Sequence, residues 1–108
     1  YGGTVSRWPQ DLALMRLVFS QRFRNELERE YAFLGKDNPE AACRTIERIV
    51  KTCRQLKEFP RSGRVGLLVG AWEMIVPGTR YVVAYDIGED RIDVLMLFHT
   101  SRQVPHVH

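Results

Sequence analysis

The sequence predicts an α+β domain built from an N-terminal strand, a two-helix hairpin and a three-stranded antiparallel meander, with both helices packed on one face of the sheet. Three observations lead to this fold: a short alternating strand pattern after residue 14, two consecutive helical periodicities between residues 20 and 59, and three segments rich in β-forming residues after residue 71. The first strand is expected to join the meander as a fourth strand. At 108 residues, the chain has room for one domain with its own core.

Residues 1–14 contain a Gly-Gly pair and a Trp-Pro pair but no sustained periodicity, so we expect them to form a flexible leader. Regular structure is expected to begin at Met15, which is also a candidate for the natural start of translation; the leader would then be foreign to the protein. The segment MRLVFS that starts there predicts a strand with Leu17 and Phe19 on one face. The folded domain is therefore expected to span residues 15–108.

The first helix follows this strand, with Ser20 as its expected N-cap. Its apolar residues recur at intervals of four, four and three, the spacing of an amphipathic helix: Phe23, Leu27, Tyr31 and Leu34. Gly35 predicts a left-handed cap at the C-terminal end of this helix. Because the next helix starts a few residues later, the two helices are expected to form a hairpin.

The second helix starts at Asn-Pro-Glu, residues 38–40, which supply a capping side chain, a proline suited to the first turn and an acid near the positive end of the helix dipole. Apolar residues then recur at helical spacing: Ala42, Ile46, Ile49, Val50, Cys53 and Leu56. The helix is expected to end near Phe59, because Pro60 cannot continue it. This helix separates Cys43 from Cys53 by about 15 Å, so both are expected to be free thiols that act as small buried apolar residues.

The second half of the chain has the composition of strands. Residues 59–66 hold two glycines, a proline and a serine, and are expected to form a loop. Residues 72–76 and 81–87 predict a hairpin that turns at Pro77-Gly78. Residues 91–98 alternate at first and then become continuously apolar, which is typical of a central strand covered on both faces.

The charge of the chain is mildly positive, +3 at pH 7, and it is unevenly placed. From Glu40 to Arg64 there are seven basic and three acidic residues, a local excess of four positive charges. A solvated helix face and a surface for an anionic partner are both open interpretations. The sequence contains neither an apolar run long enough to span a membrane nor a secretory signal, so a cytoplasmic protein without membrane contact is expected.

Two groups of residues are candidates for chemistry or binding. His99 follows the last strand and precedes Arg102 by three residues, so the pair could serve acid/base chemistry on a phosphodiester; a histidine that merely bonds neighbouring backbone is the alternative. Arg61, Arg64 and Arg80 flank loops and could, with Arg102, converge on a phosphate or an acidic peptide. No nucleotide-binding, metalloprotease or hydrolase motif occurs, so neither a metal nor another cofactor is expected.

Three segments lie between Met15 and Gln103: MRLVFSQRFRNELERE, DNPEAACRTIERIVKTCRQLKEFPRSGR and WEMIVPGTRYVVAYDIGEDRIDVLMLFHTSRQ. Together they resemble the RelE/ParE superfamily of type II toxins. The resemblance implies a toxin domain over residues 15–108 and a cognate antitoxin whose acidic or amphipathic C-terminal segment wraps it. Operator DNA would be contacted only through the antitoxin. We expect this segment to cross the helix hairpin and the sheet edge, and to cover some of the four arginines.

The superfamily has two branches that the resemblance distinguishes by target. RelE-like members cut mRNA in the ribosome with several basic groups and an acid/base group, whereas ParE-like members poison DNA gyrase. Val82 stands where the nucleases carry an arginine, and no tyrosine follows Arg102, although Arg102 matches a nuclease arginine. The Phe-Pro-Arg-Ser-Gly loop and the His-x-x-Arg ending favour the ParE-like branch. A ribosome-dependent endoribonuclease using His99, and a binding module without toxicity, are the alternatives.

Overall fold

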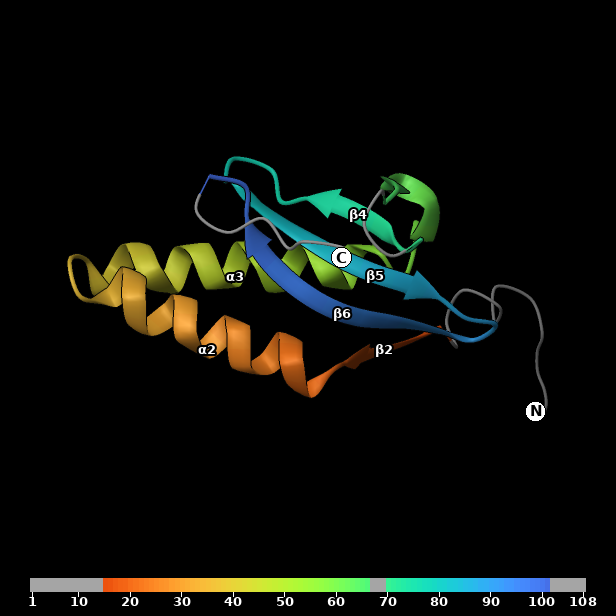
Figure 1. Ribbon diagram of the computed structural model, residues 1–108, viewed down its shortest axis with the longest axis horizontal. Coiled ribbons are helices and arrows are strands. Elements are labelled where there is room, and N and C mark those ends of the chain that lie inside the picture. Colours follow the sequence, from red (N-terminus) through yellow and green to blue (C-terminus); the bar gives the residue numbers. More distant parts are fainter. Residues whose placement is uncertain (1–14, 67–69, 102–108) are drawn as a thin grey trace.

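The computed structural model describes residues 15–66 and 70–101, so the predicted leader lies outside the described residues (Figure 1). The elements follow in this order: β2 (Arg16–Phe19), α2 (Gln21–Gly35), α3 (Pro39–Gln55), the 3₁₀ helix η1 (Pro60–Ser62), β3 (Arg64–Val65), β4 (Trp72–Ile75), β5 (Tyr81–Ile87) and β6 (Arg91–His99). The predicted α+β fold, with a strand, two helices and a C-terminal meander, is confirmed.

The sheet has the strand order β2-β6-β5-β4-β3. β2 runs parallel to β6, and the other neighbours are antiparallel. The prediction of four strands was wrong, because β3 adds a fifth: Arg64 lies opposite Glu73, and Val65 lies opposite Trp72. A two-residue strand is too short to show an alternation, so the glycines and proline around it indicated only a loop.

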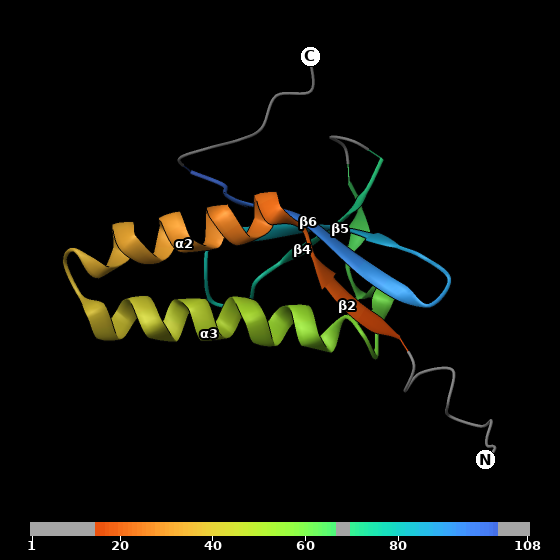
Figure 2. The same ribbon diagram turned by 90° about the horizontal axis from the view of Figure 1, so that it is seen from below.

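The two helices form one layer against the sheet. Figure 1 and Figure 2 show α2 and α3 side by side and antiparallel, with α2 along β6 and α3 behind β5. The core between the layers contains apolar residues from both helices, from β5 and β6, and from the positions directly after α3 and β4: Phe23, Ile49, Cys53, Leu56, Val76, Tyr81, Val83, Tyr85, Ile92, Val94 and Leu97. The predicted packing of both helices on one face of the sheet is therefore present.

β6 is the central strand that its apolar composition predicts. Its residues Ile92, Val94 and Leu97 face the helices, whereas Met96 and Phe98 belong to a second buried cluster with residues of β5. The register with β5 shifts between Ala84 and Tyr85, and this bulge leaves Leu95 without an opposite residue. Because of the shift, Val94 and Leu97, three positions apart, both point into the helix-facing core.

Side chains in the first half of α2 form hydrogen bonds with backbone groups of β6 beyond the point where β2 ends. Ser20, the predicted N-cap, accepts a hydrogen bond from the Phe23 N–H at 3.0 Å and donates one to the Leu95 carbonyl at 2.7 Å. Six residues further along the chain, a Glu26 carboxylate oxygen accepts the Leu97 N–H at 2.7 Å. Since a buried backbone group must find a partner, these two polar side chains fix α2 on the sheet.

The predicted left-handed cap at Gly35 was wrong. Gly35 is the last residue of α2, Lys36 after it is still right-handed (φ −60°), and the described glycines with positive φ are Gly70 and Gly78. A Cβ added to Gly35 would lie 3.9 Å from the Ala42 Cβ. This is an ordinary van der Waals distance, so Gly35 lies where α2 and α3 meet, and the space there would also hold an alanine.

α3 ends at Gln55, four residues before the predicted Phe59. The chain tightens into turns in which Leu56, Lys57 and Glu58 donate to carbonyls three residues back. Leu56 nevertheless stays buried, so the apolar pattern continues past the end of the regular helix. Pro60 limits how far a helix can run, but it does not set where this one stops.

The two cysteines have different environments. Both are free thiols, as predicted, and Cys53 is buried in the core. Cys43 is exposed, so its predicted burial was wrong; its sulfur lies 3.8 Å from the Tyr31 hydroxyl on α2. Cys43 follows Ala42, which faces α2, and one step along a helix turns the side chain by about 100°.

Candidate partner-binding surface

The end of the β5–β6 hairpin gathers Arg80, Tyr81, His99 and Ser101, here called the His99 cluster. Tyr81 lies opposite His99 in the sheet, and their rings meet edge to face at 5.0 Å. Arg80 donates from Nη1 to the Ser101 hydroxyl at 2.8 Å, and the Ser101 N–H donates to His99 Nδ1 at 3.1 Å. This last bond requires an unprotonated Nδ1, so proton transfer by His99 would use Nε2.

A hydrogen bond to helix α2 holds this cluster in place. The Tyr81 hydroxyl donates to a Glu30 carboxylate oxygen at 2.6 Å, and Tyr81 itself is buried. A short bond from a hydroxyl to a carboxylate is a strong one. The position of the His99 ring therefore depends on a contact between elements 51 residues apart in the chain.

Arg61 and Arg64 lie at the other end of the sheet, in η1 and β3. Arg64 Nη2 lies 3.5 Å from a Glu73 carboxylate oxygen, with the Arg64 side chain 66% exposed. Glu73 pairs with Ala84, four residues along β5 from Arg80, and four residues of strand span roughly 13 Å. Arg61 and Arg64 therefore do not join Arg80 around one phosphate. Arg102, the fourth predicted arginine, lies outside the described residues.

Tyr85 holds the loop that carries these two arginines. Its side chain is fully buried; its hydroxyl donates to the Pro60 carbonyl at 2.6 Å and accepts the Gly63 N–H at 3.3 Å. A Cβ on Gly63 would collide with the Glu73 carbonyl oxygen and the Tyr85 hydroxyl, so only glycine fits this approach. Burial raises the pKa of Tyr85, and the Gly63 contact partly offsets this rise.

We expect Tyr85→Phe to lower the free energy of unfolding by about 1–3 kcal/mol, because it leaves the Pro60 carbonyl and the Gly63 N–H without their partner. Urea unfolding measures the change, and Tyr31→Phe, at a tyrosine that is 47% exposed, is the control. Hydrogen exchange at the Gly63 amide should accelerate in Tyr85→Phe alone. Equal stability losses in the two variants would contradict this role.

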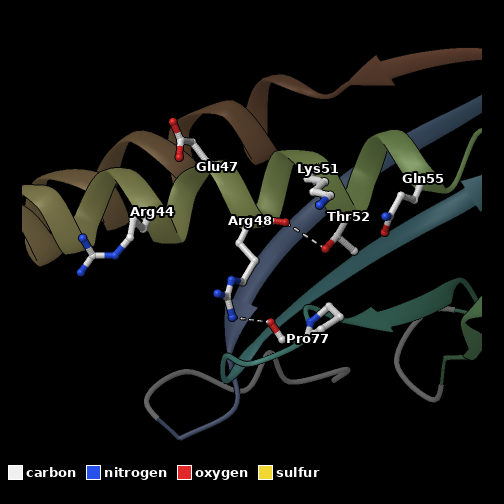
Figure 3. Close-up of a pocket in the computed structure, with 7 residues that line it drawn as sticks. All are labelled: Arg44, Glu47, Arg48, Lys51, Thr52, Gln55 and Pro77. Atoms are coloured by element: carbon white, nitrogen blue, oxygen red, sulfur yellow. Dashed lines mark hydrogen bonds between the residues drawn. The ribbon is translucent and has the colours of Figure 1, made fainter.

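A groove of about 440 Å³ lies between α3 and the turn from β4 to β5, here called the basic groove (Figure 3). Its lining residues are Arg44, Glu47, Arg48, Lys51, Thr52, Gln55 and Pro77. Arg44, Arg48 and Lys51 share one face because they are spaced by four and three residues along the helix. Figure 3 shows Arg48 reaching toward Pro77, whose carbonyl it contacts at 3.3 Å, while Glu47 points away.

These three cations belong to the positive segment from residue 40 to 64, but the sequence did not single them out. Their helical spacing was visible in the sequence, but the sequence did not show that the turn from β4 to β5 faces them. Gly78, with φ +77°, closes this turn, and the Thr79 N–H donates to the Val76 carbonyl at 3.1 Å. The predicted turn at Pro77-Gly78 is thus present and forms one wall of the groove.

The described residues, 15–66 and 70–101, contain no group of three or more His, Cys, Asp or Glu side chains placed to hold a metal ion. None of the described helices is both long enough and apolar enough to span a membrane. Val82 is 2% exposed and packs on the face of the sheet opposite the helices, with Ala84, Met96 and Phe98. Among the described residues, the basic groove, the His99 cluster and the Arg61–Arg64 loop are candidate surfaces for a charged partner.

Comparison with known proteins agrees with this fold. The family described as "ParE toxin of type II toxin-antitoxin system, parDE" matches residues 17–104. "Putative toxin Y4kP" of Sinorhizobium fredii (strain NBRC 101917 / NGR234) is 32% identical over 92 residues, which cover 85% of this chain and 95% of the relative.

A solved structure, "Chromosomal ParDE TA system from P. aeruginosa", superposes with a TM-score of 0.71 at 17% identity and covers 80% of this chain and 96% of its own. At that identity the superposition supports the fold, whereas the family match and the sequence relative support membership. The chain belongs to the ParE toxin family of type II toxin–antitoxin systems, within the RelE/ParE superfamily.

Proposed function

We propose that this chain is the toxin of a type II toxin–antitoxin module, that it arrests growth by binding DNA gyrase in the cytoplasm, and that an antitoxin neutralises it. The observation that carries the proposal is the family match over residues 17–104, which includes both helices and all of the described strands except Arg16, the first residue of β2. Gyrase follows from the resemblance to the ParE-like branch. On this proposal the chain is an inhibitor that acts through protein–protein contact and contacts operator DNA only through its antitoxin.

A ribosome-dependent endoribonuclease is the second candidate, and the His99 cluster is the observation that favours it. Arg80 and His99 lie within one network of hydrogen bonds, as a cation and an acid/base group at a phosphodiester would. Arg102 would complete this set, with Arg61 and Arg64 gripping RNA further along the sheet. Val82 weighs against the candidate, because it places an apolar side chain where the nucleases use a guanidinium.

Expression of residues 15–108 in bacteria separates these functions. Gyrase poisoning predicts filamentation and a DNA-damage response, with unaltered transcripts at early times. Ribosome-dependent cleavage predicts rapid loss of protein synthesis and cut mRNA instead. Unhindered growth would leave a binding module of the same fold, and would contradict both toxin mechanisms.

The His99→Ala and Arg102→Ala variants sharpen the comparison. A nuclease that uses these side chains should lose at least about a hundredfold in mRNA cleavage when either is removed. A gyrase inhibitor should still block supercoiling by purified gyrase when His99 is alanine. If His99→Ala abolishes both growth arrest and transcript cleavage while the variant stays folded, the nuclease function replaces the proposed one.

A further inference from the structure

We propose that the basic groove binds an acidic polypeptide segment, whose carboxylates meet Arg44, Arg48 and Lys51, and that this is where the antitoxin contacts α3. The identification of the partner as an antitoxin rests on the proposed function. The expectation that the groove binds carboxylates rests on its lining residues alone. It also moves the anionic contact away from the four arginines chosen from the sequence. Of those, Arg61 and Arg64 lie at one end of the sheet and Arg80 at the other, whereas these cations share one hollow.

The spacing of the cations matches a polypeptide. Along α3, Arg44 and Arg48 are about 6 Å apart, and Lys51 lies about 4.5 Å further. Alternate side chains of an extended segment are separated by roughly 6.6 Å, and residues four apart in a helix by about 6 Å. Successive carboxylates of an acidic segment can therefore meet successive cations without a change in α3.

Arg48 is held in place before any partner arrives. Its Nη1 donates to the Pro77 carbonyl at 3.3 Å, and a Cβ on Gly78 would overlap the same guanidinium. A guanidinium carries five N–H donors, so this contact still allows a bidentate bond to a carboxylate. A side chain that is already ordered loses less entropy on binding than a free one.

The lining favours carboxylates over the phosphates of a nucleic acid. Sequence-tolerant binding of single strands uses aromatic side chains on which bases stack, and the seven residues around the groove include no aromatic one. A polypeptide, unlike a continuous row of phosphates, can also place a lysine or a backbone N–H beside Glu47, the one acidic residue of the lining.

The test measures binding of two labelled probes to the purified full chain by fluorescence anisotropy. One probe is a twelve-residue peptide of alternating glutamate and alanine, and the other is a twelve-nucleotide oligothymidylate. The groove variant is Arg44→Gln with Lys51→Gln. Its matched control is Arg29→Gln with Arg54→Gln, which removes the same charge from exposed positions of α2 and α3 outside the groove.

We expect the groove variant to bind the acidic peptide about five- to tenfold more weakly than the natural chain, and the control to stay within about twofold. Binding to the natural chain should weaken as salt rises from about 50 to 200 mM, since both sides are exposed to solvent. Thermal unfolding of both variants should match that of the natural chain, because all four side chains are exposed.

Equal weakening in the groove variant and the control would overturn the proposal, because the peptide would then sense only net charge. Tighter binding of the oligothymidylate than of the peptide to the natural chain would overturn it as well. Neither result depends on growth arrest, so the proposed toxin function and this groove can fail separately. If the chain binds the peptide through the groove but does not arrest growth, the groove proposal is supported and the proposed toxin function is contradicted.

Discussion

Replacing Phe23 with alanine should lower the free energy of unfolding by about 3–5 kcal/mol, the range for removing a buried phenylalanine. Phe23 is 1% exposed and belongs to the core between helices and sheet. Its ring stacks on Phe19 with a centroid distance of 5.3 Å and an interplanar angle of 13°. The variant therefore loses its contacts with the end of β2 as well as the transfer energy of the ring.

Chemical denaturation with urea gives this free energy, and Phe33→Ala is the matched control on the same helix. Phe33 is 50% exposed, so its truncation should cost less than about 1 kcal/mol. Phe23 also lines a hollow of about 310 Å³ with Phe19, Leu27 and Val50, and Phe23→Ala would enlarge it. A loss at Phe23 no greater than at Phe33 would mean that α2 does not pack on the sheet as described.

Alkaline pH should destabilise the chain through Cys53. Burial raises the pKa of this thiol from 9.0 to about 12. Between these two values the unfolded chain releases the proton and the folded chain retains it, so the stabilisation present below pH 9 is lost as pH rises toward 12. At pH 11 the loss from this one group amounts to about 2–3 kcal/mol.

Urea unfolding at pH 8 and at pH 11 checks this expectation. Cys53→Ala lowers the free energy of unfolding at both values of pH because it removes a buried side chain. The further decrease in this free energy from pH 8 to pH 11 should be about 2–3 kcal/mol smaller in the variant than in the natural chain. Cys43→Ala, at the exposed thiol, should keep the full decrease. If both alanine variants lose as much stability as the natural chain, ionisation of Cys53 does not contribute.

The turn from β4 to β5 borders two of the charged surfaces. The Pro77 carbonyl accepts a hydrogen bond from the Arg48 guanidinium at the basic groove. Three residues later, Arg80 donates a hydrogen bond to the Ser101 hydroxyl in the His99 cluster. The two surfaces are therefore joined by the short segment from Pro77 to Arg80. The Arg61–Arg64 loop, in contrast, lies beside the other end of β4.

Much of the fold was readable in the sequence, because its signals are local. Ser20 and Asn38 cap the two helices through side chains that bond backbone groups three residues on, at Phe23 and Ala41. The turn at Pro77-Gly78 and the apolar central strand of residues 91–98 were likewise predicted. The sequence also sufficed to place the chain in the RelE/ParE superfamily.

The errors arose where a residue's role depends on a distant partner. Gly35 was taken for a cap but faces Ala42 across the hairpin, and Cys43 was expected in the core but lies outside it. β3 exists because β4 supplies its hydrogen bonds, not because two residues favour a strand. None of these contacts leaves a periodicity in the chain.

By itself, the sequence determined the order and type of the major elements and the family, because caps, turns and apolar spacing act over a few residues. Only the tertiary structure decided which charges lie together. It separated Arg61 and Arg64 from Arg80, and it placed Arg44, Arg48 and Lys51 opposite the turn at Pro77. Electrostatic binding depends on distances through space, and these are set by the packing of α3 on the sheet.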